Sequence, residues 1–170
     1  MKVFGLAGWS GSGKTTLMVK LLPELTGRGL TVSTMKHAHH NFDVDTPGKD
    51  SYEHRHAGAT EVLVTSANRW ALMHELRGAP EPDMDALIAH MSPVDLLLIE
   101  GFKHYGHDKM LIHRADNRKG LPIDPADPSV VAVATDSALP EAGDKPVIDL
   151  DDVPAIADFI LAHCGLKERT

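Results

Sequence analysis

The chain has 170 residues, of which 42% are hydrophobic and only 5% aromatic, so we expect one domain with an aliphatic core. Its formal net charge of −7 argues against general binding to nucleic acid or to anionic membranes. The single cysteine, Cys164, has no partner for an internal disulfide, and no signal peptide or long apolar span is present, so we expect a cytoplasmic protein.

The first elements along the chain predict a strand–loop–helix–strand crossover. The short apolar run Lys2–Ala7 predicts a buried strand, and leucines at helical spacing predict a helix from Gly13 to about Arg28. Pro23 should kink this helix or shorten its regular part. A second strand is predicted over Thr31–Lys36. Crossovers of this kind are usual in parallel sheets.

The sequence GWSGSGKTTL lies between the first strand and helix and fits the phosphate-binding loop G-x-x-x-x-G-K-[ST] at every fixed position. Gly8, Gly11 and Gly13 allow successive backbone N–H groups to face phosphate oxygens. The helix dipole adds positive potential at the same place. Lys14 is expected to reach the β- and γ-phosphates, and the Thr15 hydroxyl to bind Mg²⁺.

One absence narrows the class of phosphate loop. Neither Trp9 nor Ser10 is a lysine, so the loop lacks the second lysine of the deviant P-loop ATPases. Trp9 either stacks on a ligand or partner, or packs as an indole at the sheet edge.

The polar segment HAHHNFDVDTPGKDS follows the second strand and is too long for a tight connection. In P-loop proteins a segment here can sense the γ-phosphate or bring a carboxylate to the metal, which makes Asp43 and Asp45 candidate metal ligands. Asp50 is a candidate cap for a helix beginning near Tyr52. Three histidines also suggest zinc, but no cysteine is near and the spacing does not match a closed structural site, so solvated or phosphate-facing histidines are favoured; these are His37, His39 and His40.

The rest of the chain alternates between strands and helices. Helices are predicted over Tyr52–Ala57, Asp83–Met91 and Val153–His163, and two strands flank a turn at Ala67–Arg69. Further strands are predicted at VDLLLIEG, KMLIHRA, VVAVAT and KPVIDL. The pattern indicates a three-layer α/β sandwich of the P-loop NTPase type, with a mostly parallel central sheet and helices on both faces, in a single domain over residues 1–170.

A P-loop site needs an acidic group near its magnesium, usually at the end of a buried strand. Glu100 ends the apolar run LLLIE and is the favoured candidate, with a solvated strand-end carboxylate as the alternative. Asp95 lies at the opposite end of the same run and is the weaker candidate.

A strand-end aspartate can select guanine because the base presents two donors on one edge. Asp136, directly after VVAVAT, has such a position, but it is equally a turn former before Ser137. The usual Asn-Lys-x-Asp guanine motif is absent. The only notable basic loop either clamps a second phosphate-bearing ligand or is simply solvated; it contains Arg114, Arg118 and Lys119.

Four segments in this order, GWSGSGKTTL, MKHAHHNFDVDTPGKDSYEHRHAGA, NRWALMHEL and LLLIEGFKH, resemble the MobB family of molybdopterin-guanine dinucleotide biosynthesis adaptor proteins. The resemblance spans roughly Lys2 to Leu161. It implies a GTP-binding homodimer with weak GTPase activity at most, and the phosphate-loop residues themselves predict that Mg²⁺ accompanies the nucleotide. It also implies a partner, the guanylyltransferase MobA, which joins GMP to molybdopterin, and leaves contact with the pterin open. Phosphate-binding roles carry over onto Gly11, Ser12, Gly13, Lys14, Thr15 and Thr16.

The expected site therefore combines Lys14 and Glu100 as the groups for any hydrolysis, with Mg²⁺ between Thr15 and the carboxylate of Glu100, Asp43 or Asp45. Hydrolysis should be slow because no glutamine or arginine is evidently placed to orient water and neutralise the transition state. A small-molecule kinase and a regulatory NTPase switch remain alternatives. A kinase needs lid arginines, for which the chain offers Arg114, Arg118 and, on another segment, Arg55.

Overall fold

The structure is a computed structural model that describes residues 1–38, 42–117, 119–139 and 142–169. The elements are, in chain order, β1 (Lys2–Ala7), α1 (Lys14–Gly27), β2 (Val32–Lys36), α2 (Asp50–His56), β3 (Glu61–Thr65), β4 (Trp70–His74), α3 (Met84–Ala89), β5 (Leu96–Glu100), β6 (Lys109–His113), β7 (Val130–Thr135), β8 (Val147–Asp149) and α4 (Val153–Cys164). Each predicted helix and strand is therefore confirmed to within a few residues.

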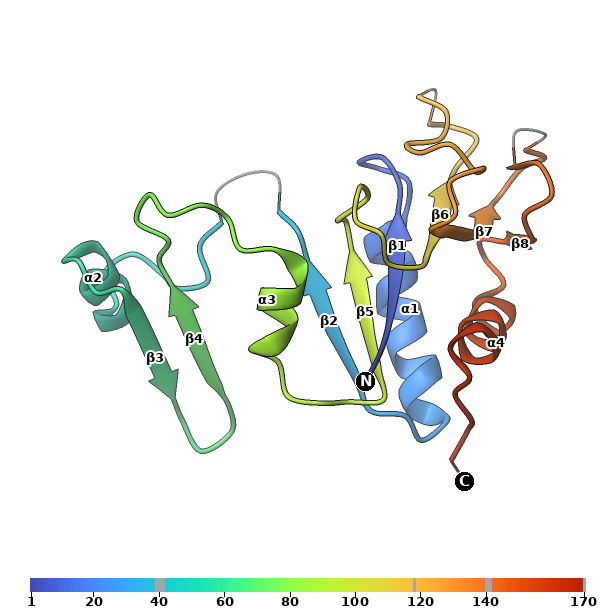
Figure 1. Cartoon of the computed structure of the whole chain (residues 1–170). Coiled ribbons are helices and arrows are strands. Elements are labelled where there is room, and N and C mark those ends of the chain that lie inside the picture. The colour runs from blue at the N-terminus through green and yellow to red at the C-terminus, as the bar shows by residue number, and fades with distance from the viewer. Residues whose placement is uncertain (39–41, 118, 140–141, 170) are drawn as a thin grey trace. The chain divides into compact units, whose positions relative to one another are not determined.

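The chain divides into two compact units, the larger formed by residues 1–37 and 92–170 and the smaller by residues 38–91. A six-stranded sheet in the order β2-β5-β1-β6-β7-β8 forms the centre of the larger unit, and every pair of neighbours is parallel. The arrowheads of these strands point to one edge of the sheet (Figure 1). The expected mostly parallel sheet with helices is confirmed, and a single domain over residues 1–170 stays a prediction.

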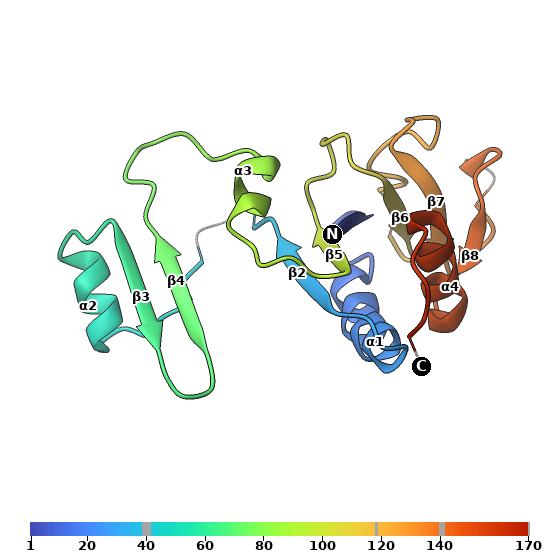
Figure 2. The same ribbon diagram turned by 60° about the horizontal axis from the view of Figure 1, so that its bottom comes forward.

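In the larger unit α1 and α4 pack side by side on one face of the sheet (Figure 2). Leucines of α1 and the residues Ile156, Ala157, Ile160 and Leu161 of α4 bury against alternate residues of β1, β5, β6 and β7. A smaller apolar cluster on the opposite face is covered in part by Leu121, Ile123 and Leu139 from loops. Residues Leu96–Ile99 of β5 are fully buried, in agreement with the apolar run LLLIE of the sequence.

The smaller unit contains the hairpin β3–β4 and the helices α2 and α3. The two strands pair antiparallel with Leu63 opposite Leu72 and Thr65 opposite Trp70, so these side chains share one face of the hairpin. Leu63, Leu72 and Trp70 are exposed. Val62, on the other face, is buried.

Two local expectations are corrected or refined by the structure. Asp50 does not cap α2: it is the first residue of the helix, Lys49 holds the cap position and no side chain caps the first turn. Pro23 does not end α1, which continues through it to Gly27. Within the described residues, no helix is long and apolar enough to cross a membrane.

Candidate functional site

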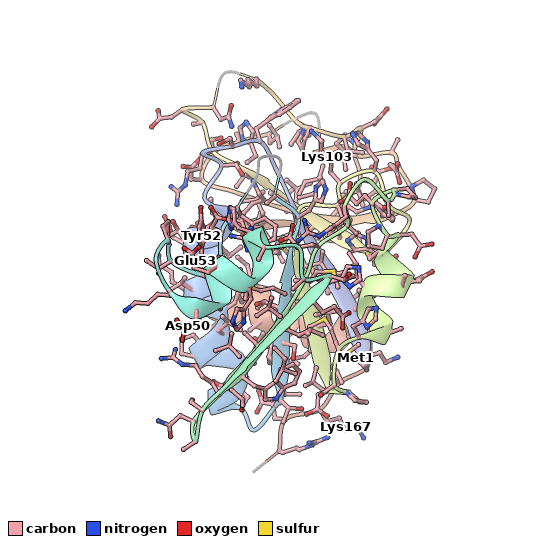
Figure 3. The ribbon with its side chains drawn as sticks, turned by 90° about the vertical axis from the view of Figure 1, so that its left-hand side faces the viewer. Met1, Asp50, Tyr52, Glu53, Lys103 and Lys167 are labelled. Carbon is pink, nitrogen blue, oxygen red and sulfur yellow. The ribbon has the colours of Figure 1, made fainter. Side chains whose placement is uncertain are left out.

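Three neighbouring strand ends bring the candidate residues together. β2 and β1 both pair in parallel with β5, and the register sets Glu100 beside Lys36 on one side and beside Leu6 on the other. The phosphate loop begins directly after β1, so it leaves the sheet at the same edge as Glu100. Lys103 lies at this end of the larger unit, whereas Met1 and Lys167 lie toward the other end (Figure 3). Ligands of open α/β sheets bind outside the carboxyl ends of the strands.

The loop between β1 and α1 has the curled backbone that its glycines predict. Gly11 and Gly13 have φ of 83° and 94°, in the left-handed region that favours glycine. The first helical hydrogen bond, from Leu17 N to Gly13 O, is 2.8 Å. Ser12 is buried, and its hydroxyl has no hydrogen-bond partner in the described part of the chain. A buried donor of this kind fits a site that an oxyanion completes.

Lys14 folds back onto the loop. Its ammonium donates to the carbonyl oxygens of Gly8 at 2.8 Å and Trp9 at 2.9 Å. Partial burial lowers the pKa of Lys14 below its usual value; Glu100 raises this pKa, while the positive charges of Lys36 and Lys103 lower it. A phosphate would supply the negative charge that this cluster of cations lacks. Thr16 lies exposed in the first turn of α1.

Thr15 and Glu100 are brought into direct contact. The Thr15 hydroxyl donates to Glu100 Oε1 at 2.9 Å, and Lys36 Nζ is 3.3 Å from the same oxygen. Because a hydroxyl and a carboxylate are oxygen ligands of the kind Mg²⁺ prefers, this pair fits the metal that the sequence predicts. Lys36 itself was not among the predicted site residues. Its position at the end of a strand was visible in the sequence, but the strand order that sets it beside Glu100 was not.

Asp43 and Asp45 lie in the smaller unit, where both bind Arg55. The Arg55 guanidinium donates to each aspartate at 2.7 Å and to Glu75 at 3.4 Å. These hydrogen bonds lower the pKa of the Asp45 carboxyl. The carboxylates and Arg55 are therefore engaged with one another, and the roles predicted for them as metal ligands and as a lid arginine stay predictions.

Asp136 ties two loops at the ends of β6 and β7. It accepts hydrogen bonds from Ala115 N at 2.8 Å and from Arg114 Nη1 at 3.2 Å. Arg114 also lies 3.8 Å from Asp151, and a Cβ on Gly13 would come within 2.9 Å of its Nε. Thus the predicted base reader already uses both oxygens within the protein, and Arg114 lies against the phosphate loop.

An open depression of about 680 Å³ adjoins these residues at the carboxyl ends of β6 and β7. Its walls are a mixture of apolar and polar surface, with His113, Asp124 and Ser137 among the polar groups. Leu121, Pro122 and Ile123 form part of one side, and Ala138 and Leu139 part of the other. Because ligand sites are concave and combine apolar walls with a few polar groups, this depression is a candidate site for part of a ligand.

Trp9 lies against two basic loops rather than in open solvent. Lys103 Nζ is 4.3 Å and Lys119 Nζ 5.6 Å from the centre of its ring. The indole Nε1 is buried and has no hydrogen-bond partner in the part of the chain that the structure describes. The expected basic loop therefore reaches the phosphate loop through Lys119, whereas Arg118 lies outside the described residues.

The remaining sequence candidates fall elsewhere. Asp95 accepts hydrogen bonds from Thr31 N and Oγ1 at the amino end of β5, away from the phosphate loop, as predicted. His39 and His40 of the zinc alternative lie outside the described residues. Among the residues that are described, no three His, Cys, Asp or Glu side chains gather where they could hold a metal ion.

Comparison with known proteins decides the family. The model of the family described as molybdopterin guanine dinucleotide synthesis protein B, MobB, matches residues 3–136. The chain belongs to the MobB family. Molybdopterin-guanine dinucleotide biosynthesis adapter proteins of Escherichia coli and Haemophilus influenzae are 44% and 43% identical to it, over 94% and 93% of this chain and 91% and 86% of theirs. The resemblance drawn from the sequence motifs is thereby confirmed.

Solved MobB structures have the same fold. The crystal structure of Bacillus subtilis MobB superposes with a TM-score of 0.75 at 26% identity, covering 96% of this chain and 98% of that one. A second MobB crystal structure gives a TM-score of 0.70 at 25% identity, over 95% of this chain and 99% of the other. The parallel sheet with its phosphate loop is therefore the MobB architecture.

Proposed function

We propose that this chain is a GTP-binding adaptor that assists the conversion of molybdopterin to molybdopterin guanine dinucleotide. The observation that carries the proposal is a complete phosphate loop, with Thr15 hydrogen-bonded to Glu100, in a chain 44% identical to the E. coli adapter protein. The proposed adaptor role is supported by membership of the family, and the proposed nucleotide binding is supported by the geometry of the phosphate loop.

The phosphates of the nucleotide lie over Gly11–Thr16, and Mg²⁺ lies at Thr15 and Glu100. The Ser12 hydroxyl, which has no partner within the described part of the chain, and the Lys14 ammonium supply donors for the phosphate oxygens. Glu100 is the preferred carboxylate because it is already 2.9 Å from the Thr15 hydroxyl. Asp43 and Asp45 would first have to give up their hydrogen bonds to Arg55.

The base occupies the depression between the loops that follow β6 and β7. His113 and Ala115, the chain neighbours of Arg114, line this depression, and Arg114 lies against Gly13, which supports a site that extends from the phosphate loop to the depression. Asp136 directly precedes Ser137 of the lining, but it already accepts from Ala115 and Arg114. Selection of guanine by Asp136 therefore requires it to exchange a protein partner for the base.

Hydrolysis of GTP is slow in the isolated protein. Of the three arginines considered, the two that the structure describes are paired with carboxylates: Arg55 binds Asp43, Asp45 and Glu75, and Arg114 binds Asp136. A cation supplied by a partner protein would remove this limit, because arginine fingers act through transition-state charge. The chain is thus mainly an adaptor, with weak GTPase activity at most, involving Lys14 and Glu100.

An adaptor of this kind has two proposed partners, a second copy of the chain and the guanylyltransferase MobA. We place this assembly in the cytoplasm, with molybdopterin as its ligand. The exposed apolar face of the β3–β4 hairpin, formed by Leu63, Leu72 and Trp70, supports the homodimer. The net charge of −7 gives no support to a nucleic-acid partner.

Calorimetric titration with GTP and with ATP, each with and without Mg²⁺, tests the proposal. We expect magnesium-dependent binding that prefers GTP, because the phosphate loop supplies affinity and the base pocket supplies selection. Equal binding of both nucleotides, or a preference for ATP, would contradict the guanine assignment and favour a P-loop kinase. Phosphoryl transfer to an added nucleoside or pterin would then distinguish the kinase from a regulatory switch.

A further inference from the structure

Lys36 stands at the phosphate site although no phosphate-loop motif contains it. It is the last residue of β2, and the parallel register of β2 with β5 sets it directly beside Glu100. The same edge of the sheet carries the phosphate loop after β1, since β1 is the next strand beyond β5. The position of Lys36 therefore follows from the backbone register and not only from a side-chain contact.

The Lys36 ammonium and the Thr15 hydroxyl contact the same oxygen of Glu100. Its Nζ lies 3.3 Å from Glu100 Oε1, the oxygen that accepts from Thr15 Oγ1 at 2.9 Å. The Lys36 side chain is 59% exposed and that of Glu100 only 12% exposed, so the lysine can move while the carboxylate stays in place. Lysine has a flexible stem with a compact charge, which suits such a movement.

A divalent cation at Thr15 and Glu100 would repel the ammonium from this oxygen, because like charges a few ångströms apart disfavour one another. The lysine then needs another anion. The positive charge of Lys36 lowers the pKa of Lys14, whose ammonium is expected to reach the β- and γ-phosphates. In the proposed site the terminal phosphate lies at Lys14, so it offers a new anion for the displaced ammonium.

We propose that Lys36 is a specificity-determining residue of the nucleotide site: it neutralises Glu100 before binding, and it contacts the terminal phosphate when Mg²⁺ takes its place. The inference rests on the proposed nucleotide function. Since a diphosphate has no γ-phosphate, the lysine strengthens binding of the triphosphate selectively.

The test is calorimetric titration of the full chain with GTP and with GDP in the presence of Mg²⁺, for the wild type and for Lys36→Met. We expect the ratio of GTP to GDP affinity to fall about tenfold in Lys36→Met, because one charge-assisted hydrogen bond to the γ-phosphate is lost. GDP affinity should change by no more than about twofold. Lys36→Arg keeps the charge and should retain most of the ratio.

Lys2→Met is the matched control, because it removes the same charge at the amino end of β1, opposite the phosphate loop. Its ratio should equal that of the wild type. An unchanged ratio in Lys36→Met, in a protein that still binds GTP, overturns the inference and leaves the proposed function intact. A wild type that binds neither nucleotide overturns both. If Lys36→Met does not melt cooperatively, Lys36→Gln is titrated in its place, with the same outcomes.

Discussion

At the scale of single residues, the phosphate loop contains polar groups that the protein itself satisfies poorly. Among the described residues, the Ser12 hydroxyl is buried and has no partner, and the Lys14 ammonium binds only carbonyls of its own loop, with no anion. Unsatisfied buried groups are costly for the folded chain, and they are common where a ligand supplies the missing partner. The loop thus retains donors that a bound phosphate would use.

The substitution Ser12→Ala should affect the stability of the fold and the affinity for GTP differently. Removal of an unpartnered buried hydroxyl should leave the melting temperature unchanged or raise it slightly, because no hydrogen bond is lost. The affinity for GTP should fall about fivefold to tenfold, because a phosphate oxygen loses a donor. Thermal melting and calorimetry measure the two effects. Ser10→Ala, at an exposed position of the same loop, should change neither, and a lower melting temperature with unchanged affinity in Ser12→Ala would contradict the assignment.

The residues that sequence could predict at this scale are those fixed by spacing along the chain. Lys14, Thr15 and the loop glycines follow from one contiguous motif, and Glu100 follows from its place after a buried strand. The contact between Lys36 and Glu100 could not be predicted, because it depends on β2 lying beside β5. The paired state of Asp136 likewise depends on the neighbouring loop that carries Arg114 and Ala115.

At the scale of elements, the loop between β5 and β6 is held to the sheet by His107. Its ring lies over Gly5 of β1, where a Cβ would clash with the ring atoms. Both ring nitrogens are buried without a hydrogen-bond partner in the described part of the chain. Burial, assisted by the nearby Lys109 charge, lowers the pKa of His107 to about 4. Lys103, which contacts Trp9, belongs to the same loop.

Acid should therefore destabilise this packing. An unfolded histidine titrates near 6.5 and the folded one near 4, so the unfolded chain binds more protons between these values, and stability falls as pH drops from about 6.5 to 4. Thermal melting at a series of pH values should show a smaller acid-induced loss for His107→Gln than for the wild type. His104→Gln, exposed in the same loop, should behave as the wild type. If the melting temperatures of all three proteins fell equally with pH, His107 would not be the cause of the acid-induced loss of stability.

The elements themselves were largely predictable, because their signals are local. Apolar runs predicted β1 and β5, and helical leucine spacing predicted α1 despite Pro23. The start of α2 was predicted two residues too late, at Tyr52: Asp50 is inside the helix, and the preceding Lys49 has the extended backbone of a cap residue. The pairing order of the strands is not local, and no pattern in the sequence specified it.

At the scale of the whole molecule, the smaller unit presents apolar side chains that its own fold leaves exposed. Leu63 is 60% and Trp70 64% exposed, and Leu72, opposite Leu63 across the hairpin, is 44% exposed. On the opposite face of β3, Val62 is buried but Val64 is 44% exposed. An exposed apolar face such as that of Leu63, Leu72 and Trp70 is a candidate interface, and in a homodimer two copies of this face would bury one another.

Analytical ultracentrifugation of the wild type and of Leu63→Glu/Leu72→Glu tests whether this face forms the homodimer. We expect a mass of twice 18.4 kDa for the wild type and of one chain for the variant, because two carboxylates would be buried without partners at the interface. Val19→Glu places the same charge at an exposed apolar position of α1, 65% exposed, and should remain dimeric. Circular dichroism should show the fold of all three proteins unchanged. If the double variant stays dimeric the interface lies elsewhere, and a monomeric wild type at micromolar concentration would refute the homodimer itself.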